Sequence, residues 1–301
     1  MSESKIQNPK SKIGIWTAAI RPKTLGAAVA PVLVGTAMAW EAGGFHAGAA
    51  LCALLGALLI QVGTNFSNDY ADYLKGADTS ERKGPLRVTQ AGLVRPATMK
   101  RATALVFGLA FVAGLYLIWR GGWPILLIGL LSILSGVLYT VGRYSLAYLG
   151  LGDLFVLIFF GPVAVGGTYY VQTLTINTVV LVVGLAVGLL ATAILLVNNI
   201  RDVEEDRQAG KKTLVVRLGK RFGIGFYAFC VVIAVLIPLE LFLVTEQHAW
   251  AILVILVVLP ALPIFHTLRT ETDPAALNPL LGATGRLLLI YSILFSIGWI
   301  L

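Results

Sequence analysis

The chain has 301 residues, of which 57% are hydrophobic and 13% are charged, and its formal net charge is +8. An average soluble domain is roughly one quarter charged, so this composition excludes an ordinary water-soluble globular protein. The apolar residues instead form blocks close to the ~20 residues that a helix needs to cross the hydrocarbon core of a bilayer.

Nine apolar blocks follow one another without a Ser/Gly-rich linker, which predicts a single polytopic membrane domain over residues 1–301. Their lengths predict helices rather than strands, because a helix satisfies its own backbone hydrogen bonds in lipid. We therefore expect an all-α integral membrane protein with about nine transmembrane helices. In chain order the blocks are Leu25–Trp40, Ala47–Ser67, Ala102–Trp119, Trp123–Val141, Leu154–Val171, Ile176–Val197, Phe222–Val244, Ala249–Leu268 and Leu287–Leu301.

The basic residues predict the orientation of these spans. With nine spans, all Lys and Arg residues except Arg120 fall on one side, including those of the connections expected to hold Arg143, Arg269 and Arg286. By the positive-inside rule that side is cytoplasmic, together with the N-terminus, and the C-terminus lies opposite. The net positive charge is then explained by topology and by attraction to anionic membrane lipid, so nucleic acid is not an expected partner.

Amide and carboxylate side chains cluster at the end of the second block. If the helix continues beyond the block, Asn65, Asn68, Asp69 and Asp72 share one face through spacings of three and four. Clustered carboxylates repel one another at a membrane boundary and require a compensating cation. Oxygen ligands without nearby His or Cys favour a hard ion, and Mg²⁺ completes its shell with water and substrate phosphate.

The same spacing recurs at the end of the sixth block, where Asn199, Asp202 and Asp206 stand at i, i+3 and i+7. A solvated surface loop does not require one acid pattern twice, so the recurrence predicts two similar halves that face each other across a central cavity. We expect Asn68, Asp72, Asp202 and Asp206 to bind magnesium. Within the sixth block, Gly184 and Gly188 are four residues apart, which predicts tight helix packing inside the molecule.

Basic residues follow each acidic motif, and phosphate groups bind to this combination of metal and cationic side chains. The expected diphosphate contacts are Lys75, Arg82, Lys83 and Arg87 after the first motif, and Lys211 and Lys212 after the second.

These motifs resemble those of the UbiA superfamily of intramembrane prenyltransferases, over essentially the whole chain. The matching residues are Asn68-Asp69-Tyr70-Ala71-Asp72 with Asp78, and then Asp202, Asp206, Gly210 and Lys211. The wider superfamily has its further acid at position 76, where this chain has Gly76. The nearest acid is Asp78, a shift that is like the 1,4-dihydroxy-2-naphthoate branch of the family.

Three further stretches resemble that branch: Arg21–Leu25, Lys75–Arg87 and Asn198–Gly219. The resemblance implies a UbiA-type fold in the bacterial inner membrane. It also implies transfer of a polyprenyl chain from polyprenyl diphosphate to 1,4-dihydroxy-2-naphthoate, with loss of diphosphate and carbon dioxide, giving demethylmenaquinone.

Within this scheme Asp69, Asp72, Asp202 and Asp206 are the expected catalytic residues. A carboxylate beside the metal could take a phenolic proton, so Asp69 is the expected general base of the acceptor. Three further residues stand at cytoplasmic helix ends and are expected to bind the acceptor carboxylate or the diphosphate. They are Arg21, Tyr139 and Arg143.

Two alternatives remain open at this stage. The same chemistry could serve another acceptor, such as 4-hydroxybenzoate, or transfer a phytyl chain to a naphthoate. A secondary transporter also has internal repeats and polar residues at midplane. However, no ionisable residue lies near the centre of a predicted span, whereas an ion-coupled transporter usually has one there.

Overall fold

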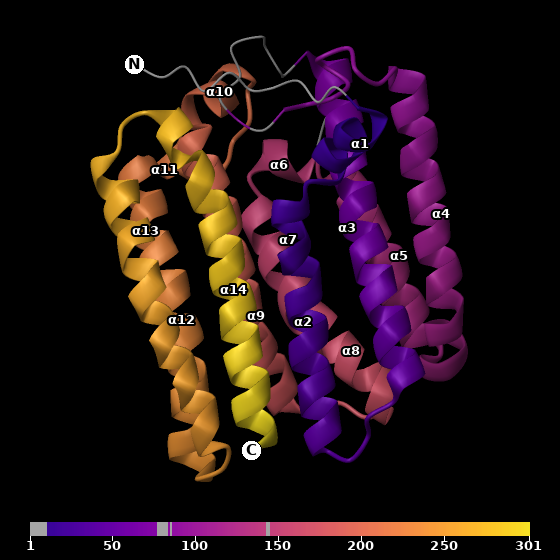
Figure 1. Ribbon diagram of the computed structural model, residues 1–301, viewed down its shortest axis with the longest axis vertical. Coiled ribbons are helices and arrows are strands. Elements are labelled where there is room, and N and C mark those ends of the chain that lie inside the picture. Colours follow the sequence, from indigo (N-terminus) through magenta and orange to yellow (C-terminus); the bar gives the residue numbers. More distant parts are fainter. Residues whose placement is uncertain (1–10, 77–83, 85, 143–144) are drawn as a thin grey trace.

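The computed structural model describes residues 11–76, 84, 86–142 and 145–301, and helices make up the architecture of this part of the chain (Figure 1). The long helices are α2 (Pro22–Glu41), α3 (Ala47–Lys75), α4 (Pro96–Gly121), α5 (Trp123–Leu138), α9 (Thr178–Arg201), α12 (Lys220–Thr245) and α14 (Asn278–Ile300). Two further spans are composite, namely α7 (Gly152–Ile158) with η1 (Phe159–Val163) and α8 (Ala164–Thr173), and η2 (Ala249–Val257) with α13 (Val258–Thr270). Short elements connect them: α1 (Lys12–Ile20), α6 (Leu146–Leu149), α10 (Val203–Gln208), α11 (Leu214–Leu218) and η3 (Pro274–Leu277).

Every predicted apolar block falls on a helix, which confirms the all-α membrane architecture. Within the described residues, eight helical stretches are long and apolar enough to cross a membrane, and the ninth block forms the shorter helix α5 of 16 residues. The chain is therefore a multi-pass membrane protein. One boundary was predicted wrongly: α14 begins at Asn278, so Arg286 lies inside this helix and not in a connection. A single charge ends an apolar block in the sequence, but an arginine can extend its guanidinium toward the interface without ending the helix.

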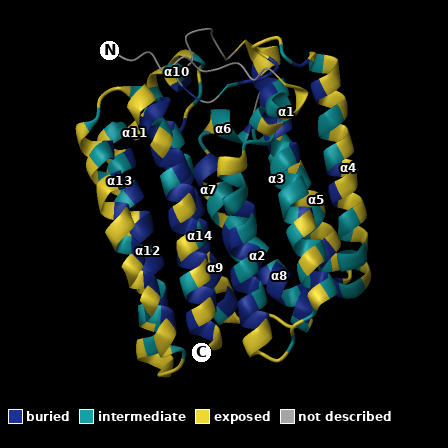
Figure 2. Ribbon diagram, viewed as in Figure 1, coloured by how far each residue is buried: buried dark blue, intermediate teal, exposed yellow. Residues whose placement is uncertain are grey.

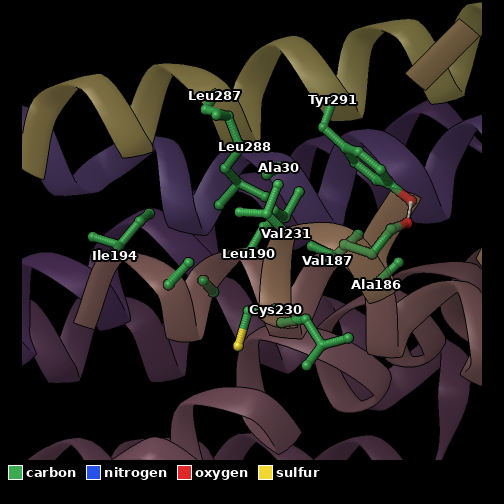
Figure 3. Packing of buried hydrophobic residues seen from close by; sticks show 14 of the residues in the cluster. Ala30, Ala186, Val187, Leu190, Ile194, Cys230, Val231, Leu287, Leu288 and Tyr291 are labelled. Carbon is green, nitrogen blue, oxygen red and sulfur yellow. Dashed lines mark hydrogen bonds between the residues drawn. The ribbon is translucent and has the colours of Figure 1, made fainter. Parts of the chain in front are cut away.

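The core is built around α9, which is apolar on nearly all sides and is enclosed by other helices (Figure 2). In its most apolar window, with mean hydropathy 2.9, 72% of the residues are buried. Helices that are apolar all round take such interior positions. Figure 3 shows Leu190 of α9 packed among Ala30 of α2, Val231 of α12 and Leu288 of α14. Nearby, Tyr291 donates a hydrogen bond from its hydroxyl to the carbonyl of Ala234 at 3.0 Å.

The fifth span is interrupted where it crosses α9. Gly161 has φ −101° and ψ −113°, which breaks the helical geometry just before Pro162. The break lies directly against Gly184 and Gly188, since a Cβ on Gly184 would lie 2.7 Å from the Cα of Pro162. The glycine pair therefore permits close contact between helices inside the molecule, which confirms the prediction made from its spacing.

Adding one methyl group at this crossing should destabilise the protein. A Cβ on Gly188 would lie 3.0 Å from the Cα of Gly161 and would clash with the carbonyl of Leu157. We expect Gly188→Ala to lower the free energy of unfolding by about 1–3 kcal/mol, as overpacking usually does. Thermal unfolding in detergent measures the effect. Gly225→Ala is the matched control, because Gly225 is exposed on α12 and its added Cβ meets nothing within 4 Å; an equal loss in both variants would contradict the packing argument.

Both acidic motifs lie at the same end of the bundle. The C-terminal end of α3 and the short helices α10 and α11 are seen together at the top of Figure 1, and the chain's C-terminus is at the opposite end. This end carries the candidate site.

Candidate active site

A cavity of about 600 Å³ runs from the acidic end down between the helices. Its deeper wall is apolar and comes from α2–α5 and the broken fifth span, with Pro31, Ile60, Leu117, Ile125 and Phe159 among its residues. The charged residues of the lining gather at the mouth. The charged and amide residues that line the cavity are Arg21, Lys23, Gln61, Asn65, Asn68, Arg87, Asn198, Asp202 and Lys211. Such a shape can hold a molecule with a long apolar tail and an anionic head.

The first motif lies on a continuous helix, because α3 runs past Asp72 and ends at Lys75. Asn68 lines the cavity and accepts a hydrogen bond from the hydroxyl of Thr140 at 2.6 Å. Asp72 is 3% exposed, and Arg87 donates to its Oδ2 from Nη2 at 2.6 Å. Because Arg87 also lines the cavity, it lies where it can contact both the carboxylate and a bound anion.

Asp69 has a different environment from its neighbours in the motif. It is 1% exposed, its Oδ2 accepts from the backbone N–H of Val88, and its Oδ1 accepts from that of Thr89, each at 3.0 Å. It is not among the residues that line the cavity. The carboxylate thus fixes the turn that follows Arg87, and this geometry does not favour the expected role of Asp69 as a proton acceptor.

The second motif differs from the first in that its helix is interrupted. α9 ends at Arg201 and α10 begins at Val203, so Asn199 and Asp206 lie on different helices. Asp202 stands between them with φ −94° and ψ 12°. Its two oxygens accept from Nε and Nη2 of Arg201 at 2.6 and 2.7 Å, and both side chains are almost wholly buried.

The remaining acid of the second motif, Asp206, accepts a hydrogen bond from Nζ of Lys211 at 2.9 Å. Burial disfavours the ammonium form of Lys211, but the carboxylates of Asp206 and Asp72 outweigh it and raise the pKa of Lys211 above its ordinary value. A single lysine therefore interacts electrostatically with acids from both motifs, so the two motifs face each other as their recurrence predicted.

The donor set fits a hard divalent ion that is shared with a substrate. Asn68 and Asp202, which have oxygen donors, line the cavity. Asp72 and Asp206 form ion pairs with Arg87 and Lys211, and these two cations line the cavity. Within the described ranges, no three His, Cys, Asp or Glu side chains are close enough to hold a metal by themselves. Mg²⁺ does not require such a cage, because it commonly takes one or two carboxylates and completes its shell with water and phosphate oxygens.

Some of the expected diphosphate contacts line the cavity, others do not, and two lie outside the described residues. Arg87 and Lys211 line the cavity. Lys75 does not: its Nζ donates to the carbonyl of Thr140 at 2.6 Å and lies 3.8 Å from the centre of the Tyr148 ring, so it ties down the segment after α5. Lys212 is exposed beside that segment. Arg82 and Lys83 lie outside the described residues, as does Asp78.

Two of the three expected acceptor contacts reach the cavity. Arg21 lines the mouth from the junction of α1 and α2, where its φ of 56° turns the chain into Pro22 at the start of α2. Tyr139 lines it from the end of α5, with its hydroxyl close to Gly152. Arg143 lies outside the described residues.

Sequence reasoning missed two buried charged residues beside the site. Arg201 received no role, although it also donates to Asn198 at 2.7 Å and to Asn278 at 3.1 Å. Asp153 is 5% exposed in the first turn of α7, and the Asn199 amide lies 3.5 Å from its Oδ1. Its position one residue before the predicted block Leu154–Val171 was the available signal, since an acid at that boundary must find a polar partner when the helix packs inward.

Comparison with known proteins shows the family and the fold of this chain. The 1,4-dihydroxy-2-naphthoate octaprenyltransferase of Escherichia coli (strain K12) is 39% identical over 295 residues, which is 96% of each chain. The 2-carboxy-1,4-naphthoquinone phytyltransferase of Synechocystis is 34% identical over 82% of this chain and 79% of its own. A UbiA homologue from Archaeoglobus fulgidus, solved with DMAPP and Mg²⁺, has the same fold with a TM-score of 0.61 at 16% identity, covering 94% and 99% of the two chains. The family model described as the UbiA prenyltransferase family matches residues 28–294, so the chain belongs to this family.

Proposed function

We propose that this protein transfers a polyprenyl chain from polyprenyl diphosphate to 1,4-dihydroxy-2-naphthoate and releases diphosphate and carbon dioxide. The observation that carries the proposal is the cavity itself, which joins two facing acidic motifs to a deep apolar wall. The near full-length identity to the Escherichia coli enzyme named for this reaction supports the choice of acceptor and the menaquinone pathway.

The polar mouth is suited to the departing diphosphate. In this proposal Mg²⁺ is held by Asn68, Asp72, Asp202 and Asp206. When bound, the ion would act as a Lewis acid toward the phosphate oxygens. Arg87 and Lys211 neutralise the remaining negative charge, since both already face the cavity. The Mg²⁺ bound to the Archaeoglobus homologue supports the use of a divalent ion.

The apolar wall protects the reactive chain. Breaking the allylic C–O bond leaves a carbocation that water would capture, and a cavity walled by residues such as Phe159 and Leu117 keeps water away. The new C–C bond forms at the ring carbon that carries the carboxylate. The bond from this ring carbon to the carboxylate carbon then breaks, its electron pair returns to the ring, and carbon dioxide leaves. Arg21 and Tyr139 orient the acceptor from the mouth of the cavity.

The charge distribution supports a location in the bacterial inner membrane with the acidic motifs facing the cytoplasm. Among the described residues, the end that carries α10 and α11 also carries most of the basic ones, including Lys211, Arg217 and Lys220. Cytoplasmic ends of membrane proteins are enriched in Lys and Arg in this way.

The direct test is an assay of the purified protein in detergent with a polyprenyl diphosphate and Mg²⁺. We expect 1,4-dihydroxy-2-naphthoate to give a prenylated naphthoquinol without its carboxylate, detected by mass spectrometry. EDTA should abolish product, and added Mg²⁺ should restore it. Product from 4-hydroxybenzoate alone would keep the chemistry and overturn the acceptor; product that survives EDTA would overturn the metal. Membership of the UbiA prenyltransferase family disfavours a transporter.

A further inference from the structure

Two cationic side chains meet beside the mouth of the cavity, where α2 contacts α14; Lys23 lines the cavity and Arg286 does not. Lys23 in the first turn of α2 and Arg286 inside α14 both extend over Gly282. A Cβ on Gly282 would lie 3.5 Å from Cδ of Lys23 and 4.0 Å from Nη1 of Arg286. Both residues are exposed, and neither forms a hydrogen bond or ion pair with any other residue in the described ranges.

Arg286 lies on a stripe that faces lipid. Ile290, Ile293 and Ile297 follow it on the same face of α14 and are 42%, 47% and 52% exposed. A lone arginine on such a face is costly unless it extends to the interface or meets an anion. Lys23, a second cation, also extends over Gly282, so the two side chains increase each other's need for a negative partner.

The depth of the pair matches the level of phospholipid headgroups. Trp299 stands near the other end of α14, about 20 Å from Arg286 at 1.5 Å per helical residue. If Trp299 marks the far interface, as tryptophans commonly do, Arg286 lies within about 10 Å of the near edge of a 30 Å hydrocarbon core. Lys23, at the start of α2, is about 26 Å above Trp40 and sits at that edge. An extended arginine reaches the same level.

We propose that Lys23 and Arg286 bind the phosphate of an anionic phospholipid at the contact of α2 and α14. The phosphate accepts hydrogen bonds from both cations, and an acyl chain of the lipid lies along the isoleucine stripe of α14. The close contact of α2 and α14 at Gly26, Gly282 and Gly285 gives the headgroup a rigid base. Basic clefts between transmembrane helices on the cytoplasmic side recognise anionic lipids in this way.

Native mass spectrometry of the delipidated full-length protein tests the proposal, by titration with phosphatidylglycerol and, separately, with phosphatidylcholine. We expect one high-affinity phosphatidylglycerol that phosphatidylcholine does not replace. Arg286→Gln should weaken it by about tenfold or more, as loss of a charged hydrogen bond does, and Arg286→Lys should retain most of the affinity. Arg221→Gln removes the same charge from an exposed position at the start of α12 and should change nothing.

Three results would overturn the proposal. Phosphatidylglycerol could bind Arg286→Gln as tightly as the wild type, or bind no more tightly than phosphatidylcholine. In a third titration, with geranyl diphosphate and Mg²⁺, the variant could lose affinity for the prenyl donor while keeping the lipid, which would assign the two cations to substrate entry. The lipid readout requires no catalytic turnover, so its failure is distinguishable from failure of the proposed prenyl transfer.

Discussion

Replacing Asp202 by alanine should reduce prenyl transfer by at least about 10²-fold and also weaken the fold. The activity falls because the cavity loses an oxygen donor of the proposed metal site, and removal of one preorganised electrostatic contact commonly costs this much. Stability falls because the Arg201 guanidinium, whose side chain is 0% exposed, loses the carboxylate that accepts two of its hydrogen bonds. Removing one partner of a buried ion pair costs about 3–5 kcal/mol. Turnover assays and thermal unfolding measure the two effects.

A double variant separates the two effects. In Arg201→Met/Asp202→Leu both buried charges are gone, so most of the stability should return while activity stays absent. The control is Glu204→Ala, which breaks an exposed pair with Arg207 worth at most about 1 kcal/mol. Recovery of turnover in the double variant would mean that Asp202 serves only to balance Arg201.

The second large effect concerns Asp69, for which the sequence and the structure suggest different roles. We expect Asp69→Asn to lower the free energy of unfolding by about 2 kcal/mol, because the amide can accept from only one of the two backbone N–H groups of Val88 and Thr89. The turn that carries Arg87 then loses its anchor, so KM for the prenyl donor should rise more than kcat falls.

A general base predicts a different kinetic pattern. If Asp69 takes the proton of the acceptor, the same variant lowers kcat by about 10²–10⁴-fold and leaves stability and donor binding unchanged. Asp273→Asn is the control, since Asp273 is an exposed carboxylate that accepts from the backbone N–H of Ala275. Normal stability with abolished turnover in Asp69→Asn would show that Asp69 acts as the general base.

Much of the fold could be predicted because its main determinant, apolar length, is local. Each block of charge-free residues became a helix, and α3 continues beyond the membrane block past Asp72, as a shared face for the amides and acids needs; it ends at Lys75. The interruption of α9 at Asp202 could not be read from spacing, because it accompanies a side-chain pair with Arg201 that i, i+3 patterns do not encode. Arg286 was placed in a connection for a similar reason. Hydropathy depends on the charge of the residue, but it does not depend on the direction in which the side chain extends.

The candidate site was predictable in its residue types but not in the partner of each residue. Sequence places Asp69 and Asp72 in one motif, yet one carboxylate holds a backbone turn and the other pairs with Arg87. Likewise, Lys75 and Lys211 both follow acids, but only Lys211 reaches the cavity, because Lys75 is held by the segment between α5 and α6. These choices depend on tertiary contacts between residues far apart in the chain.

The contact between α2 and α14 also has a consequence for how the protein is made. The first and last long helices pack side by side and complete the wall around α9 (Figure 1). The ribosome adds about 5–20 residues per second, so α14 is synthesised roughly 12–50 s after α2. During that interval the face of α2 that carries Ala27, Ala30 and Val34 has no final partner. The nascent chain must therefore hold its first helix in the bilayer, next to lipid or a membrane insertase, until the last helix arrives.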